Sequence, residues 1–474
     1  MTTIDKPLTD VVFMSITEAS GAIESGELSP LELTNAILDR IEETDGQLNS
    51  YVLVTRESAL AEAEAATQRA RAGTRLGLLD GIPMGIKDLY DTAGAVTTGG
   101  TGAYRFRVPA QDSTAVARLR AAGAVIVGKT NTHELAFGGT TNNVHYGPTH
   151  NPWMLGRIPG GSSGGSGSAL AAGQALGALG TDTGGSIRNP ASYCGITGIK
   201  PTWGLSSRAG VTAMSHTLDH TGPMARTAYD CAVMLDALQG YDPLDIDSVE
   251  HDRQDFVSGI GDGISGMTLA VIPSFVAACS SSVQAAFRDS LRVLESLGAR
   301  ITSIEPLIGV DDWRGMVLGI SAVESNDYHE LLVQQNPPTI GAAVRERMAN
   351  GLTIPAYKYA RALDARKVLE RRMHDTLKFN GIDAYLVPTT PLTAWEIDED
   401  PDRDETPMRS SMYGSIFNIS RQPAISVPNG FDPEGLPTSL QISTANWEDA
   451  TALRIAHAYQ QATDWHTKRP PLFA

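Results

Sequence analysis

The sequence predicts an α/β fold in which a β-sheet is covered by helices on both faces. Two stretches of the chain share one order of amphipathic helix, glycine and short apolar strand, and three further apolar runs have the length of buried strands. Helices and buried strands that alternate in this way pack as layers around a sheet. The two stretches are Thr114–Ala122 with Gly123 and Ala124–Val127, and Ser282–Leu297 with Gly298 and Arg300–Ile304; the three runs are Leu269–Ile272, Ala384–Val387 and Ala424–Val427.

The first 70 residues are predicted to be helical. Ser29-Pro30-Leu31-Glu32 forms a capping box with proline at the first helical position, and an apolar stripe follows it. A second helix is predicted over residues 58–72, which are rich in Ala and Glu. Two polar stretches are predicted to be irregular: residues 235–265 as a linker or long surface loop, and the acidic residues 396–405 as a solvated loop without the spacing of a calcium site.

Composition bounds the class of protein. The formal net charge is −17, which argues against a nucleic-acid binder because such proteins present a basic face. The three cysteines, Cys194, Cys231 and Cys279, have no zinc or disulfide spacing and are expected to be buried and reduced. No signal peptide and no apolar run of about 18 residues is present, so a cytoplasmic protein without a membrane span is expected.

Two glycine-rich loops, Gly160–Ser166 and Gly180–Pro190, each contain serine, and Lys87 lies on an apolar strand upstream of them. Glycine at this density suits a backbone that approaches a ligand closely or points several N–H groups at one spot. Strand alternation places Lys87 on the face opposite Met84 and Ile86, where burial would favour its neutral amine. The alternative is a surface lysine at a strand end, paired with Asp88 or Asp91.

Several short motifs match by chance. Gly123–Thr130 fits the P-loop pattern, but its middle residues are themselves predicted to be a strand, so no loop remains to hold phosphate. Gly160–Gly164 fits the nucleophile-elbow pattern without the hydrophobic strand that must precede it. Asp182-Thr183-Gly184 resembles half of an aspartic protease, yet the second half is missing. No histidine is singled out as a metal ligand or as a member of a Ser-His-Asp triad.

Taken together, these segments resemble the amidase signature family of serine hydrolases. The resemblance covers nearly the whole chain and is strongest over residues 80–230. It implies one large mixed β-sheet with helices on both faces. The chain is expected to divide into a helical segment over 1–75 and an α/β domain over 76–474. Within this domain, 235–380 is the variable region expected to shape the substrate pocket. The matching runs begin at Gly81-Ile82-Pro83 and include Val127–Asn131, Tyr146–Trp153, both glycine loops, Cys194–Thr202, Pro423–Pro428 and Ala456–Tyr459.

The resemblance also implies a Ser–cis-Ser–Lys triad, with Ser186 as nucleophile, Ser162 as proton relay and Lys87 as base. The N–H groups of the loop from Thr183 to Ser186 are expected to stabilise the oxyanion. No metal or organic cofactor is expected. The residues with implied supporting roles are Thr183, Gly184 and Gly185 for the oxyanion, Ser163 for the hydrogen-bond network, and Asp182 and Arg188 as the brace of the nucleophile loop.

Two departures from the family pattern lie near the expected pocket wall: Arg421-Gln422 before Pro423, and Gly435–Ser439 in place of Gly-Leu-Pro-Val-Gly. The main expectation is a stand-alone amidase for small apolar or aryl amides, with esters or carbamates as further substrates and a homodimer as one oligomeric state. The first alternative is a glutaminase subunit that works with partner chains of a transfer-RNA amidotransferase. The second is a nucleotide-binding protein that uses Gly123–Thr130.

Overall fold

The computed structural model describes residues 8–304, 310–335, 337–398 and 413–474. In this part of the chain, eleven strands form one sheet in the order β1-β3-β2-β6-β8-β7-β12-β13-β11-β9-β10, and β4 and β5 form a small two-stranded sheet. The strands are β1 (Tyr51–Val54), β2 (Pro83–Lys87), β3 (Val125–Thr130), β4 (Asn142–Asn143), β5 (Gly147–Pro148), β6 (Gly177–Asp182), β7 (Thr197–Lys200), β8 (His220–Ala225), β9 (Thr268–Val271), β10 (Arg300–Ser303), β11 (Ala384–Pro388), β12 (Ala424–Phe431) and β13 (Pro437–Ser443).

The large sheet is mixed, as the family resemblance implies. Strand β2 lies between β3 and β6 and is parallel to both. Strands β6, β8, β7, β12, β13 and β11 then follow one another in antiparallel pairs, and β9 and β10 complete the sheet in parallel. Parallel pairing of β2 with β6 brings the carboxyl ends of both strands to the same edge, where ligands bind in α/β sheets.

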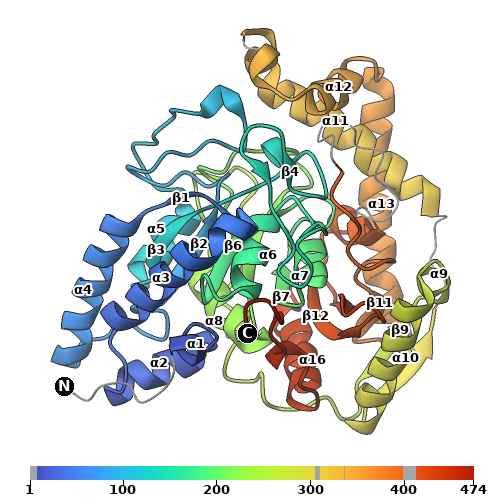
Figure 1. The fold of residues 1–474 in the computed structure, drawn as a ribbon. Helices are drawn as coiled ribbons and strands as arrows, with labels where there is room; N and C mark the ends of the chain where they lie inside the picture. The colour runs from blue at the N-terminus through green and yellow to red at the C-terminus, as the bar shows by residue number, and fades with distance from the viewer. Residues whose placement is uncertain (1–7, 305–309, 336, 399–412) are drawn as a thin grey trace.

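Helices bury both faces of this sheet (Figure 1). Leu269 and Val271 of β9 pack into the core beneath α8, α10 and α16, whereas Ala270 and Ile272 pack into a second core that includes side chains of α11 and α13. The helices are α1 (Leu8–Val11), α2 (Ile16–Ser25), α3 (Pro30–Leu48), α4 (Arg56–Ala72), α5 (Thr114–Ala121), α6 (Gly164–Ala171), α7 (Arg188–Cys194), α8 (Ala228–Leu238), α9 (Pro273–Ala277), α10 (Ser281–Ser296), α11 (Val310–Gln335), α12 (Ala342–Leu352), α13 (Ala356–Asn380), α15 (Ile416–Ile419) and α16 (Asp449–Gln461).

The predicted helix–glycine–strand units are confirmed, with ends that differ by a few residues. Helix α5 and strand β3 occupy the first unit, and α10 and β10 occupy the second. The capping box at Ser29 is present, because the Ser29 hydroxyl accepts from the Glu32 amide while Glu32 accepts from the Ser29 amide. The predicted loop at 235–265 is confirmed except for residues 235–238, which end α8; residues 239–267 contain no helix or strand. Most of the predicted acidic loop at 396–405 lies outside the described residues.

The prediction of an all-helical N-terminal segment is wrong in one respect. Strand β1 follows α3 and pairs antiparallel with β3, so this segment adds an edge strand to the large sheet. The run Tyr51-Val52-Leu53-Val54 is too short to show a strand period by itself, and only its pairing with β3 identifies it. The helices before it share the main hydrophobic core with the sheet. The division of the chain at residue 75 stays a prediction.

Candidate active site

Lys87 ends strand β2 and is fully buried. Its Nζ lies 2.7 Å from the hydroxyl oxygen of Ser162 and 2.7 Å from that of Thr181. Thr181 comes from the carboxyl end of β6, the parallel neighbour of β2, so the sheet itself places this contact. The alternative of a surface lysine paired with Asp88 or Asp91 is wrong. Asp88 Oδ1 lies 3.5 Å from Lys129 Nζ instead, and Asp91 pairs with Arg107.

Burial lowers the pKa of Lys87 to about 7, even though the carboxylates of Asp219 and Asp182 oppose this change by favouring the ammonium form. A desolvated ammonium is costly because the protein interior does not solvate charge as water does. Lys87 therefore holds a neutral amine in a substantial fraction of molecules near neutral pH, which is the form that accepts a proton.

Ser162 lies in the glycine loop that leads into α6, and the peptide bond between Gly161 and Ser162 is cis. Its carbonyl oxygen accepts from the amide of His133 and the hydroxyl of Thr132. The glycines of this loop are explained by close packing: a Cβ on Gly161 would lie 2.7 Å from the Thr140 amide nitrogen, and one on Gly165 would lie 2.5 Å from backbone atoms of Asn131. The sequence predicted glycine for approach to a ligand, but here backbone also packs on backbone.

Ser186 lies in the turn between β6 and α7, in the wall of a cavity. Its carbonyl oxygen accepts from the amide of Ser163 at 3.3 Å, which joins the two glycine loops. Ser163 also exchanges hydrogen bonds of 3.3 Å between its hydroxyl and the backbone of Thr181. Within the described residues the hydroxyl of Ser186 makes no hydrogen bond to Ser162, so the contact of Lys87 with Ser162 is present and the second contact of the expected relay is not.

The loop from Thr183 to Ser186 differs from the expectation at one amide. The N–H of Gly185 donates to Asp182 Oδ1 at 2.8 Å, so this group is engaged inside the protein. No acceptor within the described residues takes the amides of Thr183, Gly184 and Ser186. These three amides are the ones that can still serve the predicted oxyanion role, which stays a prediction.

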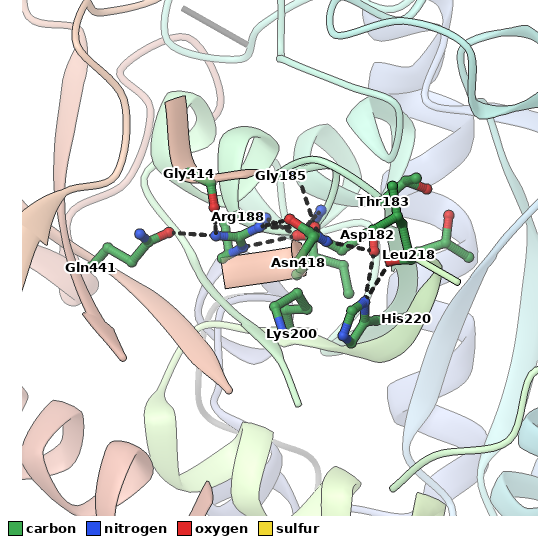
Figure 2. Close-up of polar contacts among 12 residues, drawn as sticks. Asp182, Thr183, Gly185, Arg188, Lys200, Leu218, His220, Gly414, Asn418 and Gln441 are labelled. Atoms are coloured by element: carbon green, nitrogen blue, oxygen red, sulfur yellow. Dashed lines mark hydrogen bonds and ion pairs between the residues drawn. The ribbon is translucent and has the colours of Figure 1, made fainter. Parts of the chain in front are cut away.

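Asp182 and Arg188 form a buried ion pair beside the loop that contains Ser186 (Figure 2). Both carboxylate oxygens of Asp182 accept from the Arg188 guanidinium, at 2.9 and 3.0 Å, and one also accepts from the Ile187 amide. Burial opposes ionisation of Asp182, but the charge and hydrogen bonds of Arg188 outweigh it and hold the pKa of that carboxyl well below its usual range. The pair therefore stays charged and keeps the turn around Ser186 in one shape.

Residues far away in the sequence complete this network. Asn418 donates to Asp182 and accepts from Arg188, and Gln441 and the carbonyl of Gly414 accept from the other guanidinium nitrogen (Figure 2). Sequence reasoning missed Asn418 and Gln441, as it missed Thr181. Thr181 lies inside the second glycine-rich motif, so the motif could have identified it, whereas no local sequence pattern marks Asn418 or Gln441.

Two alternatives fail on geometry, the P-loop match and a catalytic role for His220, and one prediction, on the cysteines, is confirmed. Lys129 of the P-loop match is buried inside β3, where its amine donates to the Tyr90 carbonyl and to Thr97, so it cannot reach a phosphate. His220 Nδ1 donates to the backbone carbonyls of Leu218 and Asp182, and burial holds the pKa of His220 well below its usual range, so it stays neutral. The three cysteines are buried and unpaired, as predicted.

Neither a metal cluster nor a membrane span is present in the described part of the chain. Its residues contain no group of three or more His, Cys, Asp or Glu side chains arranged to hold a metal ion. Across the same residues, no helix is long and apolar enough to cross a membrane.

A cavity of about 540 Å³ opens onto Ser186. One wall comes from the glycine loops, with Gly161, Gly184 and Ser186, and the opposite wall comes from α11 and α12. Most of the lining is apolar or glycine, and Arg347 is the single charged side chain among the described lining residues. The Arg347 guanidinium donates to the carbonyl of Phe137, which also lines the cavity.

The model of the family described as Amidase matches residues 32–453, which include every residue placed above at the site. The chain belongs to the amidase signature family. A curated relative is a subunit of the glutamyl-tRNA(Gln) amidotransferase of Roseiflexus castenholzii, which is 38% identical over 487 residues, covering 98% of this chain and 98% of the relative.

Solved structures of the amidase signature family agree with the fold. A 6-aminohexanoate cyclic dimer hydrolase complexed with substrate superposes with a TM-score of 0.90 at 27% identity and covers 98% of this chain and 100% of that one. The corresponding glutamyl-tRNA(Gln) amidotransferase subunit of Thermotoga maritima superposes with a TM-score of 0.80 at 32% identity, over 97% and 96% of the two chains. This amidase is therefore an enzyme that acts on C–N amide bonds.

Proposed function

We propose that this amidase hydrolyses small, uncharged and largely apolar amides through an acyl-enzyme on Ser186. The observation that carries the proposal is the cavity next to Ser186, whose described lining contains no carboxylate and mostly apolar atoms. A substrate with a free ammonium group would leave that charge unpaired in an apolar cavity, which is costly. An acyl chain or aryl ring would instead gain from burial against side chains such as Leu318 and Ile354.

The proposed chemistry starts from the neutral amine of Lys87. This amine takes the hydroxyl proton of Ser162, and Ser162 takes that of Ser186 as the Ser186 oxygen attacks the carbonyl carbon. The 2.7 Å contact between Lys87 Nζ and Ser162 Oγ supports the first transfer. Binding of substrate has to bring the Ser186 hydroxyl to Ser162 for the second, because catalytic hydrogen bonds often tighten only in the complex.

The oxyanion that forms on the carbonyl is proposed to accept from the amides of Thr183, Gly184 and Ser186. Loss of one such donor typically costs about 10²- to 10³-fold in rate. The proton then returns through Ser162 to the leaving amine, and a water molecule activated by the same pair hydrolyses the ester on Ser186. Esters and carbamates present the same carbonyl geometry, so they are secondary substrates in this proposal.

The test is a panel of 4-nitroanilides, primary amides, carbamates and 4-nitrophenyl esters of increasing acyl length, assayed with the purified chain alone. Turnover of apolar anilides that is lost in Ser186→Ala supports the proposal. Turnover of none of the panel, or equal turnover by Ser186→Ala, rejects it. Mass spectrometry of the wild-type enzyme mixed with a slow ester would locate an acyl adduct on the peptide that contains Ser186.

A second candidate is a glutaminase subunit that supplies ammonia to partner chains, and the curated relatives favour it over the first. The observation within this chain that suits it is Arg347 in the cavity wall, since a guanidinium matches the carboxylate of glutamine. Its test is glutamine turnover by the chain alone and after co-expression with candidate partner chains. Glutamine turnover that is lost in Arg347→Gln, without turnover of anilides, would decide for the second candidate.

A further inference from the structure

Residues 183–186, whose amides are proposed to hold the oxyanion, are called the anion-binding turn below. Residues 213–219 form a loop between this turn and the wall of the cavity formed by α11 and α12. Asp219 ends this loop directly before β8, whose His220 pairs with Asp182 of β6. That register places Asp219 beside Thr183, the residue after Asp182. At the other end of the loop, Met214 lines the substrate cavity.

One carboxylate connects these two sides. Asp219 Oδ1 accepts from the hydroxyl of Thr183 at 2.5 Å. Asp219 Oδ2 accepts from the amides of Met214 at 2.8 Å and Ser215 at 3.0 Å. An ionised carboxylate can accept all three bonds, whereas an amide of the same shape would turn two of its own hydrogens toward one set of donors. Asp219 therefore fixes the distance between the anion-binding turn and one cavity wall.

A second carboxylate holds the same loop from outside. Glu324 of α11 accepts from the amide and hydroxyl of Thr217, at 3.1 and 2.9 Å, and from the hydroxyls of Ser215 and Tyr359. Glu324 is buried, whereas Asp219 is half-buried, and no charge effect of Glu324 on Lys87 is found. It provides a matched control, because it shares the loop and the chemistry without the position next to Lys87.

Asp219 and Glu324 differ in the effect of their charge on Lys87. Asp219 and Asp182 are the carboxylates whose charge acts on Lys87, and Asp182 is already neutralised by its ion pair with Arg188. Arg208 also acts on Asp219, but it is itself paired with two other carboxylates, Asp245 and Asp247. Within the described residues Asp219 has no ion-pair partner, so its charge bears directly on the lysine.

We propose that Asp219 is a positioning residue for amide hydrolysis, which holds Thr183 and Met214 in register and places a carboxylate charge where it acts on the amine of Lys87. The inference rests on the proposed function, since it assumes that Lys87 is the base for Ser186. It adds a residue that contacts neither substrate nor nucleophile. In this proposal the Asp219 carboxylate both aligns the anion-binding turn and acts on the protonation of Lys87. A change at Asp219 therefore alters the position of Thr183 and the charge state of Lys87 together.

The experiment compares Asp219→Asn with Glu324→Gln and follows kcat/KM against pH for an anilide that the wild type hydrolyses. Loss of the Asp219 charge destabilises the ammonium form of Lys87, so the acid limb of the profile should move by about one unit to lower pH. The rate on the plateau should fall roughly 10-fold, because donors of the loop lose a charged acceptor. Glu324→Gln should alter KM through the helical wall and leave the acid limb in place.

An acid limb that stays in place in Asp219→Asn, or that moves equally in Glu324→Gln, would overturn the inference. Should Asp219→Asn fail to fold, Thr183→Val and Thr183→Ser give a second test: serine keeps the hydroxyl that donates to Asp219 and valine loses it, so kcat of the valine variant should be lower than kcat of the serine variant. Equal kcat in these two variants would also overturn it. Full activity of Ser186→Ala would instead reject the proposed function, so the two failures are distinguishable.

Discussion

Lys87 and Asp182 end strands β2 and β6, and Ser162 lies in the loop before α6; all three are fully buried and hydrogen-bonded. The helices α11 and α12 instead line the substrate cavity with side chains such as Leu318, which is 40% exposed. The first region is held by directional bonds to buried charges, and the second by apolar contacts. A change in the first region leaves a buried group without its partner, which costs far more than the loss of an apolar contact at a cavity wall. Substitutions in the central network should therefore cost more stability and activity than substitutions in the cavity wall.

The largest effect expected in the central region is that of Ser186→Ala. Loss of the nucleophile should lower kcat for the best anilide by roughly 10⁴-fold or more, since residues of a nucleophilic triad act as one unit. The matched control is Ser192→Ala in α7, which removes a fully buried hydroxyl whose one hydrogen bond among the described residues is to Thr390, and this variant should keep kcat within a few-fold. Equal losses in the two variants would mean that α7, rather than the Ser186 oxygen, is what the assay senses.

The next effect concerns stability. Asp182→Asn leaves the guanidinium of Arg188 buried without its counter-charge, and removal of one partner from a buried pair costs about 3–5 kcal/mol of the free energy of unfolding. Urea unfolding followed by circular dichroism measures this loss. Asp289→Asn breaks an ion pair with Arg292 whose partners are mostly exposed, and should change the unfolding free energy within experimental error. If Asp182→Asn lowers the free energy of unfolding no more than Asp289→Asn does, Asp182 and Arg188 do not brace the loop that contains Ser186.

A smaller effect is expected from pH. Burial lowers the pKa of Lys87 to about 7, and only the neutral amine accepts a proton, so kcat/KM should fall as the pH drops below that value. At pH 5.5 the loss should be roughly 30-fold relative to the plateau, because the neutral fraction falls tenfold per pH unit. Initial rates from pH 5 to 9 in buffers of constant ionic strength measure this limb. A flat profile would show that Lys87 is not the base.

The smallest effect is expected at the cavity wall. Leu318→Ala removes apolar surface that faces the substrate, so KM for long-chain anilides should rise by a few-fold, equivalent to about 1 kcal/mol, with kcat nearly unchanged. Leu331→Ala on the same helix is the control, because Leu331 is 67% exposed and does not line the cavity. A large fall in kcat for Leu318→Ala would show that the cavity wall is as important for catalysis as the buried central network, which contradicts the comparison.

The fold class and the helix–glycine–strand units could be predicted from the sequence. Glycine after α5 and α10, a capping box at Ser29 and short apolar runs are local signals, because capping and strand alternation depend on neighbouring residues. Strand β1 was missed because a four-residue run acquires its identity only by pairing with β3. The glycines at 161 and 165 were predicted for a ligand, whereas they also make room for backbone from other loops.

By itself the sequence determined which residue types the site contains: a lysine on an apolar strand and serines in two glycine loops. Tertiary structure alone decided that the lysine is buried against Ser162 and Thr181, that the Gly185 amide is engaged by Asp182, and that Asn418 and Gln441 complete the network. The physical reason is that burial and hydrogen-bond partners come from strands and loops up to about 250 residues apart, and no local pattern encodes which of them meet.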